Sequence, residues 1–159
     1  MKQVINFLLP ETEETERLNK IRKRYDPSHK EIWPHLTFVY PFQKINEEEI
    51  HTHIKEIVKN FEPFNISLKK LGKSAKGNYL YLLPKKGRKK ILKLHDRLHT
   101  GPLENHSNPD VPKYIPHITL GVFDTGEELD EAIRSLQKKK IKFDFTLDRL
   151  HLLEINEDG

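Results

Sequence analysis

The chain has 159 residues, with 28 Lys and Arg against 24 Asp and Glu, so its formal charge is +4. It contains no apolar run near the roughly 18 residues of a membrane-spanning helix, and no signal-peptide pattern at its N-terminus, so we expect a cytoplasmic protein. The absence of cysteine excludes disulfides, thiolate nucleophiles and cysteine-ligated zinc.

The first half of the chain is predicted to fold as strand, helix, strand, helix, strand. Apolar runs, helical spacing and a capping residue at Asn46 indicate these elements. In order they are strand Val4–Leu9, helix Glu13–Tyr25, strand His35–Tyr40, a helix beginning after Asn46, and strand Phe64–Leu71.

The second half is predicted to repeat this order, with a longer loop from Gly101 to Lys113 before its second strand. Thr125 and Gly126 are start signals for the last helix. The elements are strand Tyr79–Leu83, helix Lys86–Leu98, strand His117–Phe123, helix Glu127–Lys139 and one long final strand over Ile141–Ile155.

Three sequence blocks recur in the same order in both halves. Pro34-His35-Leu36-Thr37 matches Pro116-His117-Ile118-Thr119 at an offset of 82, and blocks beginning at Phe64 and Phe7 recur at offsets of 79 and 74. We therefore predict an α+β fold of two pseudo-symmetric β-α-β-α-β repeats, residues 2–73 and 77–155, with mainly antiparallel sheets. The repeats are expected to form one two-lobed, bilobal domain over residues 1–159, with a central cleft.

Each repeat carries a His-x-Thr motif. Residues two apart on a strand point to the same face, so His35 projects with Thr37 and His117 with Thr119. Packing the repeats about a two-fold axis would place both pairs across a cleft. One imidazole can then accept a proton while the other donates one, and the hydroxyls can donate to oxygens held between them. This arrangement suits metal-free cleavage of a phosphodiester.

The paired motifs P-H-L-T and P-H-I-T-L-G, some 80 residues apart in a repeated frame, resemble the two-histidine phosphoesterase superfamily. The resemblance covers the whole chain and is narrowest to the 2′-5′ RNA ligase branch, which includes RNA 2′,3′-cyclic phosphodiesterases. It implies that His35 and His117 are the catalytic acid and base and that Thr37 and Thr119 contact the substrate phosphate. The first motif lacks the glycine that follows the second, which puts the substrate wall on that side in doubt.

From these motifs we predict an enzyme, a metal-independent phosphodiesterase without cofactor that hydrolyses 2′,3′-cyclic phosphate ends of RNA or nucleotides to 2′-phosphates. Two alternatives stay open: cleavage or joining of 2′-5′ linkages, and an RNA-end binding protein with little turnover. Partners other than RNA ends or cyclic nucleotides are not indicated; we expect a monomer that does not contact membranes. The sequence leaves open which histidine is the acid.

For several other residues the sequence gives weaker evidence of a function. His95 and His99 have zinc-binding spacing on a helix, but a third ligand is not evident, so no metal site is predicted. The remaining histidines are expected at the surface: His29, His51, His53, His106 and His151.

The basic run from Lys85 to Lys90, with Lys93, is either a solvated helix face or a guide for an RNA backbone. Aromatic residues beside the motifs either stack on a base or pack the strand junctions. They are Trp33, Tyr40 and Tyr114. Phe7 and Tyr81 occupy equivalent places in the first strand of each repeat and either line the cleft or fill the core.

Overall fold

The computed structural model describes residues 1–111 and 113–156, which form seven strands, four α-helices and one short 3₁₀ helix. The elements in chain order are β1 (Lys2–Leu8), α1 (Glu13–Tyr25), β2 (His35–Gln43), α2 (Glu47–Val58), β3 (Phe64–Lys73), β4 (Tyr79–Lys86), α3 (Arg88–Leu98), η1 (Gly101–Leu103), β5 (Ile118–Val122), α4 (Gly126–Lys139), β6 (Phe143–Leu147) and β7 (His151–Ile155).

Side-chain caps fix where helices begin. The Asn46 side-chain oxygen accepts hydrogen bonds from the amides of Glu48 and Glu49, at 3.0 and 3.3 Å, at the start of α2. The Thr125 hydroxyl accepts from the Glu128 amide at 3.2 Å at the start of α4. These bonds satisfy amides that have no partner inside the helix. The two helix starts predicted from the sequence are therefore confirmed.

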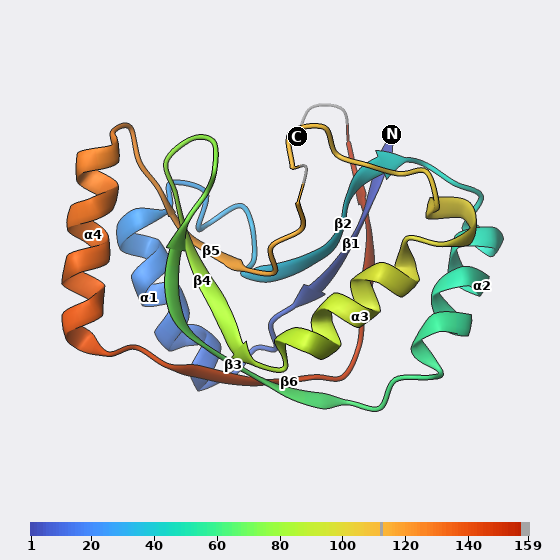
Figure 1. Cartoon of the computed structure of the whole chain (residues 1–159), viewed down its shortest axis with the longest axis horizontal. Helices are drawn as coiled ribbons and strands as arrows, with labels where there is room; N and C mark the ends of the chain where they lie inside the picture. Colours follow the sequence, from blue (N-terminus) through green and yellow to red (C-terminus); the bar gives the residue numbers. More distant parts are fainter. Residues whose placement is uncertain (112, 157–159) are drawn as a thin grey trace.

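The strands form two antiparallel sheets, one in the order β2-β1-β7 and the other in the order β5-β4-β3-β6. Helices α4 and α2 lie at opposite ends of the molecule with the sheets between them (Figure 1). This mixed architecture with antiparallel sheets confirms the predicted fold class.

The two repeats exchange strands and helices. The last strand of the first repeat, β3, lies between β4 and β6, whereas β7 at the end of the second repeat pairs with β1. The first helix of each repeat crosses in the same way, since α1 packs on β5 and β6 while α3 packs on β2. Neither sheet is therefore built from one repeat alone.

The prediction of one long strand over Ile141–Ile155 is wrong, because this segment divides into β6 and β7. Strand β6 pairs with β3 in one sheet, and β7 pairs with β1 in the other. The two pairings lie in separate sheets, and the chain leaves extended pairing over residues 148–150 between them. The alternating sequence pattern indicates which side chains are buried, but it does not indicate which sheet each segment of the chain joins.

Several other element ends also differ from the prediction; strand β2, for example, continues to Gln43 rather than ending at Tyr40. Strand β4 continues to Lys86, so α3 begins at Arg88 rather than at Lys86. Strand β5 begins at Ile118, which leaves His117 immediately before its first residue. Differences of one or two residues at an element's end are expected, because chain ends depart gradually from ideal geometry.

One continuous hydrophobic core joins the two sheets. Leu36 and Phe38 of β2 are fully buried in it, as are Ile118 and Leu120 of β5. Thr37 lies between Leu36 and Phe38, and Thr119 lies between Ile118 and Leu120. Both threonines are only half-buried. The predicted alternation is confirmed, and it directs the polar residues of both motifs away from the core.

Candidate active site

The two motif histidines are held by the same hydrogen bond. His35 Nδ1 lies 2.8 Å from the Trp33 carbonyl oxygen, and His117 Nδ1 lies 2.7 Å from the Ile115 carbonyl oxygen. A carbonyl oxygen only accepts, so Nδ1 carries the proton in each ring and Nε2 is the basic nitrogen. In each case a proline separates the two partners, and it biases the residue before it towards extended geometry.

Burial lowers the pKa of both histidines. The pKa of His117 falls to about 4, mainly because the ring is desolvated; the bond to Ile115 opposes this fall, and His35 adds a smaller lowering. The pKa of His35 is also lowered by burial and by the nearby Arg22, whereas its bond to Trp33 and the Asp26 carboxylate act in the opposite sense. Both imidazoles therefore favour the neutral form in the free protein.

The structure brings the two motifs together. Strands β2 and β5 contact each other although they belong to different sheets. His35 and Thr119, one from each motif, line the same hollow of about 360 Å³. His117 lines an adjoining hollow of about 720 Å³, and Tyr79 borders both. Three of the four predicted residues, His35, Thr119 and His117, thus border one composite cleft, whereas Thr37 lines neither hollow.

The threonine hydroxyls are available to a ligand. Thr37 uses its backbone carbonyl oxygen to accept a hydrogen bond from the Tyr114 hydroxyl, at 2.8 Å. Within residues 1–111 and 113–156, neither the Thr37 nor the Thr119 hydroxyl has a hydrogen-bond partner. Each lies two residues after a histidine and has a hydroxyl that can donate a hydrogen bond, and Thr119 lines the hollow that it shares with His35.

The sequence pattern of the 2′-5′ RNA ligase superfamily matches residues 10–159. The chain belongs to this superfamily. The chain is also 32% identical over 156 residues to a Bacillus pumilus protein named "Putative phosphoesterase", covering 96% of this chain and 88% of that one. Membership supports phosphoesterase activity in the broad sense, and the superfamily acts on RNA and nucleotide substrates.

Solved structures of Escherichia coli LigT share the fold. Escherichia coli LigT complexed with ATP matches with a TM-score of 0.57 and 14% identity, covering 95% of this chain and 84% of LigT. LigT complexed with 3′-AMP matches with a TM-score of 0.55 and 12% identity, covering 98% and 97%. At this level of identity the likeness shows the fold alone.

A buried ion pair lies beside His35 and holds the loop that precedes it. Arg22 donates to the Asp26 carboxylate from Nε at 3.2 Å and from Nη2 at 2.8 Å, and both side chains are more than nine-tenths buried. Arg22 Nη2 also donates to the Ile32 carbonyl oxygen at 2.8 Å. These bonds tie the end of α1 to the loop that leads into His35. This ion pair was not predicted from the sequence, although residues four apart at a helix end are close enough to pair.

The neighbours of the two motifs on the adjacent strands differ. Tyr81 of β4 lies opposite Thr119, and its ring stacks on the His117 ring with centroids 3.6 Å apart. The residue opposite Thr37 is Asn6, not Phe7. Phe7 is buried in the core. The first strands therefore align at an offset of 75 rather than the predicted 74, and only Tyr81 of the predicted pair faces the cleft.

Asn6 has an unusual position. It pairs in register with Thr37 on one side and His151 on the other, so these three residues form a row on one sheet face. Its side chain is 5% exposed, and its Oδ1 atom has no hydrogen-bond partner among the described residues. A buried polar atom without a partner costs stability, which makes Asn6 a candidate ligand contact. The sequence offset of 74 matched Phe7 with Tyr81, whereas an offset of 75 would have matched Asn6 with Tyr81.

Tyrosines line the hollow beside His117. Tyr40, Tyr79 and Tyr81 border it, together with Ile115 and the segment 74–77. Burial, together with a smaller contribution from the neighbouring Tyr81, raises the pKa of Tyr40 to about 12, and burial also raises the pKa of Tyr81. The Tyr40 and Tyr81 phenols therefore stay neutral near pH 7, and the hollow offers aromatic ring faces and hydroxyl groups to a ligand.

The other two aromatic candidates pack the strand junctions. The Trp33 indole N–H donates to the Leu9 carbonyl oxygen at 2.6 Å. The Tyr114 ring stacks on His95 with centroids 3.7 Å apart, while its hydroxyl donates to Thr37. Both polar atoms are therefore occupied by bonds to the backbone, which favours the packing interpretation.

Several other histidines lie deeper than predicted. His29, His106 and His151 were expected at the surface but are half-buried, because each bonds to the backbone. His29 donates to Asp26, His106 donates to Tyr40, and His151 Nδ1 accepts from the Leu8 amide. His53 is also half-buried and donates to Leu98. His51 is exposed, as predicted.

His95 and His99 lie ring against ring, with centroids 4.2 Å apart. His99 Nδ1 donates to the His95 carbonyl oxygen at 2.8 Å, and His95 Nδ1 lies 3.1 Å from the Asp96 carboxylate. Within the part of the chain that the structure describes, no three His, Cys, Asp or Glu residues are grouped to hold a metal ion. Among the same residues, no helix is both long and apolar enough to span a membrane.

Proposed function

We propose that this chain is a metal-independent phosphodiesterase that hydrolyses 2′,3′-cyclic phosphate ends of RNA or nucleotides to 2′-phosphates. The observation that carries the proposal is the matched pair of histidines. Each has its Nδ1 proton committed to a backbone carbonyl. Each therefore offers Nε2, which has no hydrogen-bond partner within residues 1–111 and 113–156, to exchange a proton in the cleft.

The proposed reaction adds one water molecule. One histidine takes a proton from water through Nε2 while the water oxygen forms a bond to phosphorus. The bond between phosphorus and the ribose 3′ oxygen breaks, and the second histidine gives its Nε2 proton to that oxygen. The product carries a 2′-phosphate and a 3′-hydroxyl, and solvent returns the two histidines to their starting protonation states.

The surroundings favour His117 as the base and His35 as the acid. A base must be unprotonated, and His117, with a pKa of about 4, has lost its proton near neutral pH. Of the two rings, only His35 has a carboxylate, Asp26, that raises its pKa and favours the protonated form. Environments that push two pKa values apart are the usual way in which a site assigns acid and base roles.

The threonines and tyrosines complete the proposed site. The Thr37 and Thr119 hydroxyls donate to the non-bridging phosphate oxygens, where negative charge concentrates in the transition state. The hollow bordered by Tyr40, Tyr79 and Tyr81 accommodates the nucleoside attached to the phosphate. Aromatic rings are common partners of unpaired bases.

A second candidate is cleavage or joining of 2′-5′ linkages, which the match to the 2′-5′ RNA ligase superfamily favours. It uses the same two proton carriers but a different attacking or leaving group. A 2′-5′ linked dinucleotide assayed beside a 2′,3′-cyclic mononucleotide separates the two reactions.

The test is hydrolysis of a 2′,3′-cyclic mononucleotide with and without EDTA, followed by ³¹P NMR. We expect a 2′-phosphate and no effect of the chelator. The exposed His51→Gln variant is a matched control that removes an imidazole outside the cleft. A rate that collapses with EDTA and returns with a divalent ion would contradict the proposal, and a 3′-phosphate product would contradict the assigned leaving oxygen.

A further inference from the structure

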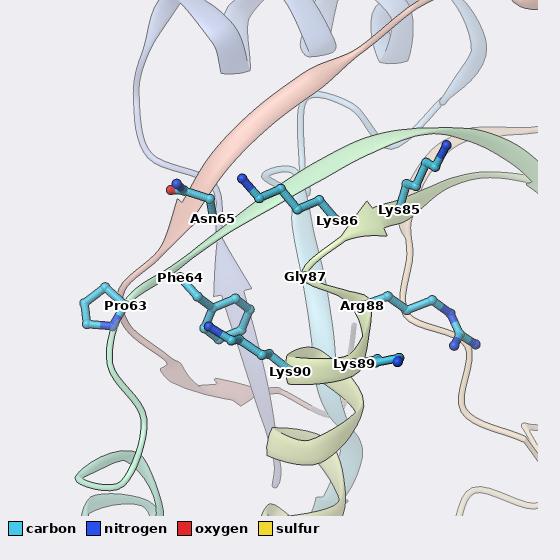
Figure 2. Close-up of a pocket in the computed structure, with 9 residues that line it drawn as sticks. All are labelled: Pro63, Phe64, Asn65, Lys85, Lys86, Gly87, Arg88, Lys89 and Lys90. Carbon is cyan, nitrogen blue, oxygen red and sulfur yellow. The ribbon is translucent and has the colours of Figure 1, made fainter.

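A strongly basic hollow lies outside the cleft, where β4 meets α3. Its volume is about 700 Å³, and Pro63, Phe64 and Asn65 form the wall on the β3 side. Figure 2 shows the cationic side chains around it. We use the name basic hollow for the five that line it: Lys85, Lys86, Arg88, Lys89 and Lys90.

The charges of the basic hollow are not neutralised by the chain. All five cations are exposed, no carboxylate lines the hollow, and within residues 1–111 and 113–156 none of the five forms an ion pair. Asp144 is close enough for Lys86 to lower its pKa, but this carboxylate accepts a hydrogen bond from Ser67. Lys90 covers the buried Phe64 ring, with its ammonium 5.5 Å from the ring centroid.

One glycine concentrates these cations. Gly87 has φ +84°, and a Cβ there would lie 2.8 Å from the Asn65 carbonyl oxygen. This left-handed residue therefore joins β4 to α3 directly, without a loop. The lysines that end the strand thus lie beside the cations of the first helical turn.

The cations of the basic hollow lie at the start of α3, where the helix dipole disfavours positive charge. The first turn of α3 holds no acidic residue, and its start has no side-chain cap. Cations at a helix N-terminus oppose the macrodipole, which favours anions there. The other three α-helices each carry acidic residues in the first turn and a capping side chain. A stability cost of this kind at one place is typical of a site that binds a ligand.

Strand β4 connects the basic hollow to the cleft. Tyr81 stacks on His117 at one end of the strand, and Lys85 and Lys86 end the other. Figure 1 shows β4 running from beside β5 to the start of α3. Lys86 lies five positions after Tyr81, a distance of about 17 Å at about 3.3 Å per strand residue. A mononucleotide in the cleft does not reach that far, whereas an oligonucleotide does.

We propose that the basic hollow binds the phosphodiester backbone of an RNA whose cyclic phosphate end lies in the cleft. RNA ends, rather than free nucleotides, are then the substrate class; this inference rests on the proposed function. The chemistry favours a polyanion over a membrane surface, because the exposed large apolar side chains lie elsewhere. Those in the described residues are Met1, Ile32, Tyr79 and Ile115.

A binding measurement tests the basic hollow without relying on turnover. The probe is a fluorescent single-stranded octanucleotide RNA ending in a 2′-phosphate, titrated by anisotropy over a range of salt concentrations. The variant is Arg88→Ala/Lys89→Ala, and the control Lys138→Ala/Lys139→Ala removes two exposed lysines from α4. Each lost contact to a single strand lowers the slope of log K against log salt by about 0.7, so we expect a drop of about 1.4 in the variant alone.

Equal slopes in wild type and both variants would overturn the inference. So would binding to vesicles containing phosphatidylserine that depends on Arg88 and Lys89 while RNA binding does not. Circular dichroism would verify folding, since alanine is favourable in an exposed helix.

Kinetics then separate this inference from the proposed function. We expect wild type to prefer an oligonucleotide with a cyclic phosphate end over the cyclic mononucleotide in kcat/KM, and the preference to shrink in Arg88→Ala/Lys89→Ala. A preference unchanged by the substitutions would overturn the inference. Absence of turnover with both substrates would contradict the proposed function, and the anisotropy slopes would still decide the inference.

Discussion

The His35 and His117 halves of the cleft share a backbone frame but differ in what surrounds it. In both, a carbonyl two residues earlier fixes the Nδ1 proton. Around His35 the chain places a buried Arg22–Asp26 ion pair, and around His117 it places the stacked ring of Tyr81. The repeated motif thus sets the tautomer, while residues that differ between the two repeats set how readily each ring takes a proton.

This difference gives two similar histidines unlike roles in the proposed mechanism. A symmetric site would hold two imidazoles of equal pKa and would have no preferred direction of proton transfer. Here desolvation lowers the pKa of His117 to about 4, while Asp26 opposes the lowering at His35. Substitutions on each side should therefore have distinguishable effects.

The largest effect is expected from the histidines themselves. His35→Gln and His117→Gln should each lower kcat/KM for a 2′,3′-cyclic mononucleotide by roughly 10²–10⁴, the range for general acid–base groups. Circular dichroism should show unchanged folding, and His51→Gln should keep the wild-type rate. Near wild-type activity in either cleft variant would refute the two-histidine mechanism.

The next effect is on stability and belongs to the His35 half. Arg22→Met leaves the buried Asp26 carboxylate without its partner and should reduce the free energy of unfolding by about 3–5 kcal/mol. Urea denaturation measures it. The matched control is Lys59→Met, which breaks an exposed ion pair with Glu56 and should cost no more than about 1 kcal/mol. Equal losses in the two variants would show that the Arg22 pair is not special.

A smaller effect should come from Asn6, which takes the place of Tyr81 in the His35 half. Asn6→Leu removes a buried amide whose Oδ1 has no partner in the described chain. We expect the free energy of unfolding to rise by about 1 kcal/mol while turnover falls, because the group is retained for a ligand. Lower stability with unchanged turnover would assign Asn6 a structural role instead.

The motifs and helix caps were predictable because they are local. Asn46 and Thr125 satisfy amides within three residues, and His35 and Thr37 share a face by strand geometry alone. The exchange of β3 and β7 between the sheets was not, because alternation reports burial without naming the partner strand. The same ambiguity led to the offset of one residue that paired Phe7, rather than Asn6, with Tyr81.

A further effect concerns stability in acid. The pKa of His117 is about 4 when folded, below the usual value of about 6.5 when unfolded. As pH falls through this window the unfolded chain takes up the proton first, so stability declines. His117→Gln should show a smaller loss of Tm between pH 6.5 and 4 than wild type or His51→Gln. Parallel declines in all three proteins would exclude a lowered pKa at His117.

The pH dependence of kcat/KM for a 2′,3′-cyclic mononucleotide tests the acid–base pair most directly. With His117 as base and His35 as acid, the profile should be a bell with its maximum between about pH 4 and 6.5. The limbs belong to the coupled pair, so variants are needed to assign them. The residual activity of His35→Gln should lose the alkaline limb, and that of His117→Gln the acidic limb. A wild-type rate that rises steadily into alkaline pH, or variants that keep both limbs, would contradict the account.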